Sequence, residues 1–371
     1  MDYSIYDATF HTGPARRASK RARQAAVKSF SRCALSLVLF SLIASAVIYA
    51  VEIAIVLIYG AGTANEIFTS NYFMWAMQVL GPYIIAFPIL LLITKGLPRA
   101  RYKSSKLAAG EFLTVFLISC GVMVFGSVIS NLISAAIEIA FGVPVVDVTS
   151  DIILSTPLWI ILAVVVVIGP IVEEIIFRKV FIDRMSIYGD RLAIVVSSVL
   201  FGLFHGNISQ LIYATALGCV LGYVYTKTRK IKYTVALHIL LNFFGTVPSI
   251  IMLRCADTMD KISAKYPDGV IPDNAFSDSV EIIKASVTVI SLSAVQYALA
   301  AIGIILLIVL TAKRAYTVPD NCEIRLRKRT VFRAAFFNFG MIVFIIFSAL
   351  TILLSINPDI MLELIGAEAV S

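Results

Sequence analysis

The chain alternates between long apolar runs and short polar connections. A helix that crosses a bilayer needs about twenty consecutive apolar residues. The runs that approach or exceed that length cover residues 33–59, 73–94, 112–141, 152–176, 191–205, 211–226, 232–252, 286–311 and 334–356. The fifth and sixth runs are short and close together, so they form either a tight hairpin or a pair in which one run does not fully cross. The pattern predicts an all-α, polytopic transmembrane bundle of about nine spans, with eight as the alternative.

Lysine and arginine gather in every second connection, which indicates how the chain is oriented. Basic residues are dense before residue 33 and in the connections 95–106, 178–191, 227–232 and 313–329. The connections 60–72 and 142–151 have none, and the segment 253–285 is acidic on balance. Cytoplasmic loops carry the excess of basic residues in membrane proteins. The charges therefore predict a cytoplasmic N-terminus and an extracytoplasmic C-terminus.

The composition agrees with a membrane protein. The sequence is 59% hydrophobic and 15% charged, with a mean hydropathy of +0.92. In a typical soluble domain about a quarter of the residues are charged. The net charge of +8 lies in the short connections, so it favours membrane orientation over nucleic-acid binding. Five scattered cysteines without a CxxC pair indicate neither a disulfide framework nor a zinc-thiolate site. The basic leader precedes an apolar run too long for a cleavable signal peptide.

Glycine and proline suggest where helices loosen or pack closely. The pair Gly169-Pro170 should kink or loosen the fourth span, because proline removes a helical hydrogen bond. Small residues four apart let two helices approach closely. Such pairs occur at Gly202/Gly206 and Gly218/Gly222.

Three short stretches place ionisable or amide side chains inside predicted spans. They are EEIIFR (Glu173 to Arg178), FGLFH (201–205) and HILLN (238–242). A charge in hydrocarbon is costly, so such residues are functional candidates. Glu174 and Arg178 are four apart on one helical face, in the order that favours an ion pair. Glu173 has no such partner on its own helix, and an unpaired buried carboxylate suits general acid–base catalysis.

The other two stretches supply imidazole and amide groups. His238 and Asn242 are also four apart, so both can donate hydrogen bonds to one developing negative charge. His205 ends the fifth run, one turn after Phe201. With Glu173, these groups can activate water directly or bind a divalent metal through Glu173, His205 and His238.

The ordered set resembles the EExxxR, FxxxH and HxxxN motifs of the CPBP family. That family comprises the type II CAAX prenyl endopeptidases and related bacteriocin-processing or bacteriocin-immunity proteins. The resemblance covers about residues 152–250. It implies that Glu173 activates the hydrolytic water, that His205 assists or ligates a metal, that His238 and Asn242 stabilise the oxyanion, and that Glu174 and Arg178 hold the geometry. The metal would be zinc, and a metal-free glutamate mechanism is the alternative.

The resulting hypothesis is an intramembrane endopeptidase of the CAAX, metalloendopeptidase-like type. No HExxH, GxSxG or GxGD pattern suggests a rival protease class. The expected substrate is a membrane-tethered peptide or protein, prenylated or otherwise hydrophobic, and the expected surroundings are membrane lipid in a bacterial plasma membrane, without nucleic acid. The alternative is a non-catalytic immunity, scaffold or transport-accessory protein.

The hypothesis divides the chain into five regions. They are a basic cytoplasmic leader (1–32), a three-helix membrane region (33–150), a CPBP-like catalytic core (151–252), an extracytoplasmic acidic segment (253–285) and a two-span region (286–371). Two other intramembrane acids, Glu52 and Glu138, are expected to be structural. Counted from Arg191, His205 lies about 20 Å deep, whereas Glu173 is near the cytoplasmic side. A single site therefore requires a water-filled cavity, a tilted fifth helix, or a fifth span that starts at a lower position.

Overall fold

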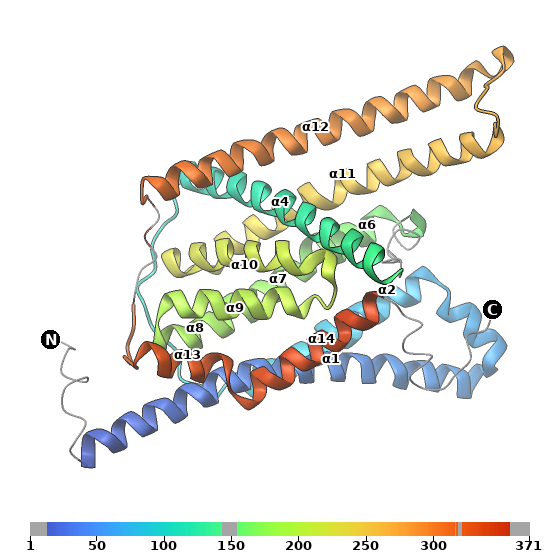
Figure 1. The fold of residues 1–371 in the computed structure, drawn as a ribbon. Helices are drawn as coiled ribbons and strands as arrows, with labels where there is room; N and C mark the ends of the chain where they lie inside the picture. Colours follow the sequence, from blue (N-terminus) through green and yellow to red (C-terminus); the bar gives the residue numbers. More distant parts are fainter. Residues whose placement is uncertain (1–12, 143–153, 316, 318–320, 357–371) are drawn as a thin grey trace.

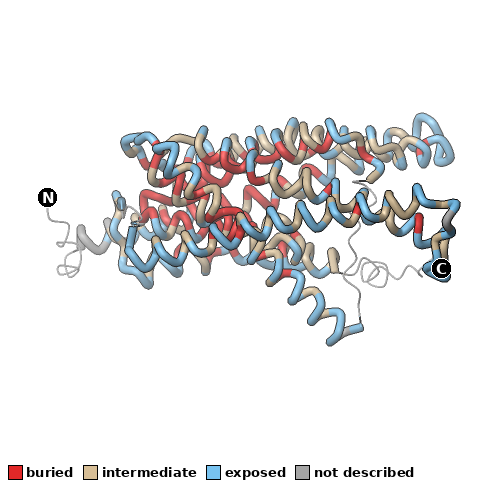
Figure 2. Tube along the Cα trace, turned by 90° about the horizontal axis from the view of Figure 1, so that it is seen from above, coloured by how far each residue is buried: buried red, intermediate tan, exposed pale blue. Residues whose placement is uncertain are grey.

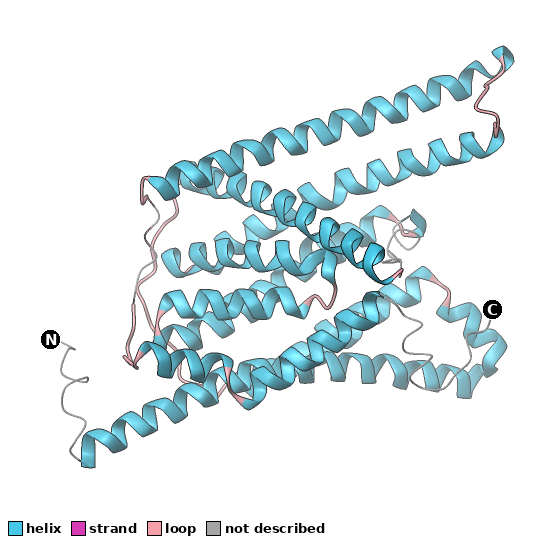
Figure 3. Ribbon diagram, viewed as in Figure 1, coloured by secondary structure: helices cyan, strands magenta, loops and turns pink. Residues whose placement is uncertain are grey.

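The computed structural model describes residues 13–142, 154–315, 317 and 321–356 (Figure 1). Within these ranges the chain is helical apart from short connections (Figure 3). The α-helices are α1 (Gly13–Phe68), α2 (Asn71–Val79), α3 (Phe87–Thr94), α4 (Ala109–Phe141), α6 (Leu158–Ile161), α7 (Gly169–Glu174), α8 (Asp183–Met185), α9 (Asp190–Phe204), α10 (Ile208–Thr228), α11 (Ile231–Lys265), α12 (Phe276–Ala312), α13 (Lys328–Phe336) and α14 (Phe339–Ile356). The predicted all-α class is confirmed.

Eight helical stretches of the described chain are long and apolar enough to cross a membrane. They make the chain a multi-pass membrane protein. Eight of the nine predicted runs correspond to these stretches, whereas the fifth run forms α9, which has only 15 residues. The structure thus favours the alternative of eight spans, because α9 is too short to cross fully as a straight helix. Orientation across the membrane stays a prediction.

Several helices extend beyond the predicted spans. Helix α1 begins at Gly13, so most of the basic leader is helical, and it kinks at Gly60, which has a φ of 78°. Helices α11 and α12 continue through most of the acidic segment 253–285 and run side by side to their connection (Figure 1). There Lys265 donates to Asp278 at 2.7 Å. That segment is therefore the far end of a helical hairpin.

The fourth span is wound unevenly, as Gly169-Pro170 predicts. Wide π-helical turns, η3 (Leu162–Ile168) and η4 (Ile175–Ile182), flank α7 on both sides, and a third, η2 (Leu80–Ala86), joins α2 to α3. Pro170 lacks the amide hydrogen that a regular helix needs at that position. Wide turns of this kind often mark functional segments of a helix. Here they enclose the two adjacent glutamates.

Helices α9 and α10 lie in the middle of the bundle, between α4 with α12 on one side and α1 with α14 on the other (Figure 1). Buried residues concentrate there, whereas the outer faces are exposed (Figure 2). The predicted small-residue packing is confirmed. A Cβ at Gly218 would lie 3.0 Å from the Cα of Ser198, and one at Gly202 would overlap the Thr215 side chain. The two glycines let α9 and α10 pack almost backbone to backbone.

Helices from opposite ends of the described chain pack against each other. Helix α14 packs against α1, and the backbone amide of Gly340 donates to the hydroxyl of Ser31 at 2.9 Å. A Cβ at Gly340 would overlap the Ser31 backbone, so only glycine permits this approach. The first and last described spans therefore form one layer against the core.

Candidate active site

A buried ion pair anchors the site. Glu174 and Arg178 have no exposed side-chain surface, and the Arg178 Nε lies 3.3 Å from the Glu174 Oε2. The Arg178 guanidinium also lies 4.9 Å from the centre of the Phe201 ring and donates through Nη1 to the Ser197 hydroxyl at 3.4 Å. Ser197 in turn donates to the Phe177 carbonyl at 2.8 Å. The predicted pairing of Glu174 with Arg178 is confirmed.

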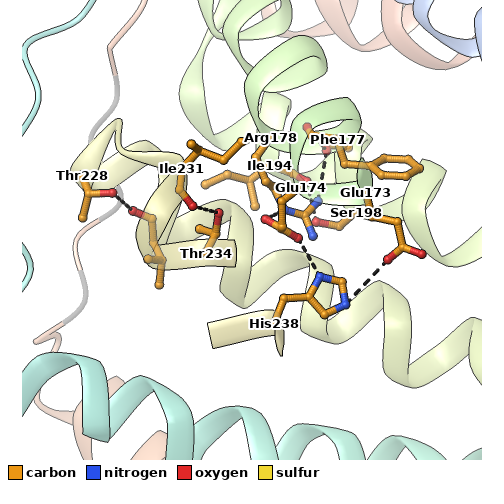
Figure 4. Close-up of polar contacts among 12 residues, drawn as sticks. Glu173, Glu174, Phe177, Arg178, Ile194, Ser198, Thr228, Ile231, Thr234 and His238 are labelled. Atoms are coloured by element: carbon orange, nitrogen blue, oxygen red, sulfur yellow. Dashed lines mark hydrogen bonds and ion pairs between the residues drawn. The ribbon is translucent and has the colours of Figure 1, made fainter. Parts of the chain in front are cut away.

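His238 connects the Glu174–Arg178 pair to Glu173 (Figure 4). Its Nδ1 lies 3.0 Å from the Glu174 Oε1, and its Nε2 lies 3.6 Å from the Glu173 Oε2. The imidazole is nearly buried, whereas 24% of the Glu173 side chain is exposed. Glu173 thus has no partner on its own helix, as expected, but it faces His238 of α11. The sequence did not predict that one imidazole contacts both glutamates, because this depends on how α11 packs against α7.

Glu173, Glu174, Arg178 and His238 form a tetrad of ionisable side chains. The Glu174 carboxylate is paired with the Arg178 guanidinium at 3.3 Å. Glu173 faces the imidazole of His238 at 3.6 Å and is partly exposed. Glu173 is therefore the acid of the tetrad that a bound group can reach.

His205 contacts Phe201, and Phe201 contacts His238 and Arg178. The His205 Nδ1 lies 2.8 Å from the Phe201 carbonyl oxygen, so Nδ1 donates, and in the tautomer with this hydrogen alone Nε2 is an acceptor. The Phe201 ring packs edge-on against both imidazoles, 4.8 Å from His205 and 5.9 Å from His238 between ring centres. Within the described ranges, His205 forms no ion pair with a carboxylate. The FGLFH stretch therefore joins the site by aromatic contact.

Asn242 lies one turn beyond His238 on α11. Its Nδ2 donates to the Val165 carbonyl at 2.9 Å. Val165 belongs to η3, where the wide turn frees backbone carbonyls from regular helical bonds. This contact uses one of the two amide hydrogens and bridges α11 to the fourth span.

A tyrosine that the sequence did not single out lies near Glu173. The Tyr83 hydroxyl lies 3.3 Å from the position that a Cβ would take at Gly169. Gly169 precedes Glu173 by four residues, so both lie on one face of α7. The only signal in the sequence was the GP pair of η2, Gly81-Pro82, directly before Tyr83.

The described residues do not supply a complete metal site. Three ligands, Glu173, His205 and His238, were expected for zinc, and only Glu173 and His238 face each other. Among the described residues no group of three or more His, Cys, Asp and Glu side chains is placed to hold a metal ion. A catalytic zinc takes three protein ligands. The donor set does not fit the ion as it stands, and zinc binding stays a prediction.

Comparison with known proteins agrees with the three motifs. The family described as "Type II CAAX prenyl endopeptidase Rce1-like" matches residues 155–244, the segment that carries the tetrad, His205 and Asn242. The predicted resemblance is confirmed. Residues 155–244 are therefore similar to this family of type II CAAX prenyl endopeptidases.

Two curated relatives each match about a quarter of the chain. "Putative membrane peptidase YdiL" of Bacillus subtilis is 32% identical over 108 residues, which is 28% of this chain and 42% of the relative. "Membrane-embedded CAAX protease MroQ" of Staphylococcus aureus is 29% identical over 103 residues, 26% of this chain and 42% of the relative. The chain thus spans less than half the length of the curated relatives it matches. No solved structure matches it.

Proposed function

We propose that the protein is an intramembrane endopeptidase that hydrolyses a peptide bond with water activated by Glu173. The observation that supports this most directly is the contact of one imidazole with two glutamates. His238 is held by the buried Glu174 on one side and faces the partly exposed Glu173 on the other. The similarity of residues 155–244 to a CAAX endopeptidase family supports the same reaction class.

The proposed chemistry follows from the two contacts of His238. Glu174 accepts the Nδ1 hydrogen of His238 and so fixes the orientation of the ring. With a proton on Nε2, Glu173 is the base that removes a proton from water, and the hydroxide oxygen attacks the peptide carbonyl carbon. The carbonyl oxygen becomes an oxyanion, and the Nε2–H of His238 is the donor closest to Glu173 that can stabilise it. Glu173 then gives its proton to the leaving amine as the C–N bond breaks.

The remaining residues have supporting roles in this proposal. Arg178 keeps Glu174 ionised by direct pairing, so that Glu174 remains an acceptor for His238. The second amide hydrogen of Asn242 adds a donor for the oxyanion, as the family resemblance implies. His205, with its Nε2 acceptor, assists the water. No step requires a metal ion, and zinc remains the alternative source of water activation.

The substrate class follows from the surroundings of the site. The tetrad lies on helices that are long and apolar enough to span a membrane. A substrate that reaches it laterally must itself be membrane-associated, so we propose a hydrophobic or prenylated peptide tethered to the bilayer. A bacterial plasma membrane is the proposed location, because both relatives come from bacteria.

The test compares peptide termini in membranes from cells that express the wild type or Glu173→Gln at matched abundance. A matched control is Glu138→Gln, which removes an exposed glutamate from α4. We expect termini that occur with the wild type and with Glu138→Gln, and that disappear with Glu173→Gln. If all three strains give the same termini while deletion of the gene has a phenotype, the non-catalytic immunity or scaffold role replaces the protease proposal.

A further inference from the structure

A basic groove runs along the N-terminal part of α1. It has a volume of about 430 Å³. Lys20, Arg23 and Lys28 line it with exposed side chains, while Val27 and Ser31 are half-buried. We propose that this groove binds the phosphate headgroup of an anionic phospholipid. The proposal is independent of the protease function.

Positive charge in the groove is not offset by its own helix. No acidic residue occurs between Gly13 and Val51. Within the described chain, Lys20, Arg23 and Lys28 form no ion pair with an acid. Three unpaired cations on adjacent turns attract an anion, and basic residues next to a membrane span are attracted to anionic lipids.

The elements around the groove do not neutralise it either. Helix α13 packs against α1 and brings the exposed Arg329 and Arg333. The acid of α8, which also packs against α1, is Asp183, and it is occupied by the Tyr225 hydroxyl at 2.8 Å and by Lys179 at 3.1 Å. Arg32 also lines the groove, and its guanidinium donates to the Ile93 carbonyl. The net effect is a concave surface of one sign.

The continuation of the groove distinguishes a lipid from a soluble anion. Eleven residues make about three helical turns, or roughly 16 Å, so residues eleven apart lie on nearly the same face. Lys28 is therefore followed on its face by Leu39, and Ser31 by Leu42. These leucines are 41% and 51% exposed. A phosphate bound at the basic end with acyl chains along the leucines matches this change from cationic to apolar surface.

Helix α13 indicates that the groove lies at the level of the lipid headgroups. It is a nine-residue helix with basic side chains and an exposed Phe332, and it is held to the bundle by the buried Ala334 and Ala335. Helices that combine basic and aromatic residues in this way lie in the plane of the membrane interface. An interfacial helix beside the groove places the three cations near lipid phosphates.

The proposal is tested by native mass spectrometry of the full chain in mild detergent. The protein is titrated with phosphatidylglycerol or with phosphatidylcholine of the same acyl chains. The groove variant combines Lys20→Gln, Arg23→Gln and Lys28→Gln. The control combines Arg254→Gln, Lys261→Gln and Lys284→Gln, which removes equal charge from exposed positions on α11 and α12.

We expect wild type and control to prefer phosphatidylglycerol, and the groove variant to bind it at least about tenfold more weakly. Equal weakening in both variants, or equal affinity for the two lipids, would overturn the proposal. Displacement of phosphatidylglycerol by inorganic phosphate alone would point to a soluble anion and also overturn it. Because the three residues are exposed, folding should be retained. Should the variant aggregate, wild-type binding must still weaken as salt is added, and salt-independent binding would contradict the inference.

Discussion

The Nδ1 of His238 lies 3.0 Å from the carboxylate of Glu174, although 64 residues separate the two along the chain. Through this contact Glu174 holds the imidazole at Nδ1. Glu173 faces the other ring nitrogen, Nε2. The two adjacent acids therefore have different environments. Glu174 is fully buried and ion-paired, and Glu173 is partly exposed. Five experiments follow from this arrangement and from the packing around it.

Replacing Glu174 by glutamine should destabilise the protein strongly. The change leaves Arg178 buried without a counter-charge, and breaking a buried pair costs about 3–5 kcal/mol. Thermal unfolding in detergent measures the effect. The control is Glu111→Gln, because the pair of Glu111 with Lys227 is 46% and 32% exposed and should contribute no more than about 1 kcal/mol. Equal losses from the two substitutions would show that the tetrad is not a buried unit.

Replacing Glu173 by glutamine should reduce activity strongly and leave stability almost unchanged. Its side chain is partly exposed and is not part of the Arg178 pair, so the unfolding temperature should stay close to that of the wild type. Loss of a general base costs about 10²–10⁴-fold in rate. Peptide hydrolysis by the purified protein, with a substrate found from the terminus mapping, measures kcat. Activity within a few-fold of the wild type would rule out Glu173 as the base.

The Phe201→Leu substitution should impair catalysis more than binding. The buried Phe201 ring contacts Arg178, His205 and His238, so its loss lets the site residues shift. A misplacement of 1 Å can cost about 10²-fold in rate. Kinetic analysis should show a lower kcat with a smaller change in KM. The matched control is Phe276→Leu, because Phe276 is 73% exposed. A change confined to KM would contradict a positioning role.

Metal removal should leave a large part of the activity. The described side chains offer two facing donors, Glu173 and His238, where catalytic zinc takes three. Dialysis of the purified protein against a chelator, followed by metal analysis and an activity assay, tests this. If activity disappears with the metal and returns on addition of zinc, His205 or another donor completes the site in solution and the metal-dependent alternative is correct.

Gly218→Ala should destabilise the protein where Gly62→Ala does not. Alanine is favoured over glycine in a helix by about 1 kcal/mol, and a Cβ at Gly62 meets nothing within 4 Å. At Gly218 the same Cβ lies 3.0 Å from the Ser198 backbone. Overpacking of this kind costs about 1–3 kcal/mol. Unfolding curves of the two variants give the comparison, and a stabilised Gly218→Ala would mean that α9 and α10 can separate freely.

The sequence predicted those features that depend on one helix at a time. The pairing of Glu174 with Arg178, the loosened turn at Gly169-Pro170 and the small faces of Gly202 and Gly218 follow from spacing along one segment, and all are confirmed. The class of the fold follows from the lengths of the apolar runs.

The features that the sequence did not predict depend on contacts between segments. The second contact of His238, the bond of Asn242 to Val165 and the approach of Tyr83 to Gly169 each join two helices. No spacing rule gives the relative rotation of two helices. The sequence predicted the length of α9 but counted it as a ninth span, because hydropathy does not reveal that a helix of 15 residues can be enclosed by neighbours.

The hydrogen bond between Ser31 and Gly340 joins groups that are made at very different times. The two residues are 309 positions apart, so at roughly 5–20 residues per second the ribosome needs about 15–60 s to pass from one to the other. During that interval α1 is in the membrane without α14, and its packing face is open to lipid or to other proteins. Residues 155–244, made in between, must wait for α14 before their outer layer closes. A membrane bundle built in this order has an open outer layer until α14 has been made.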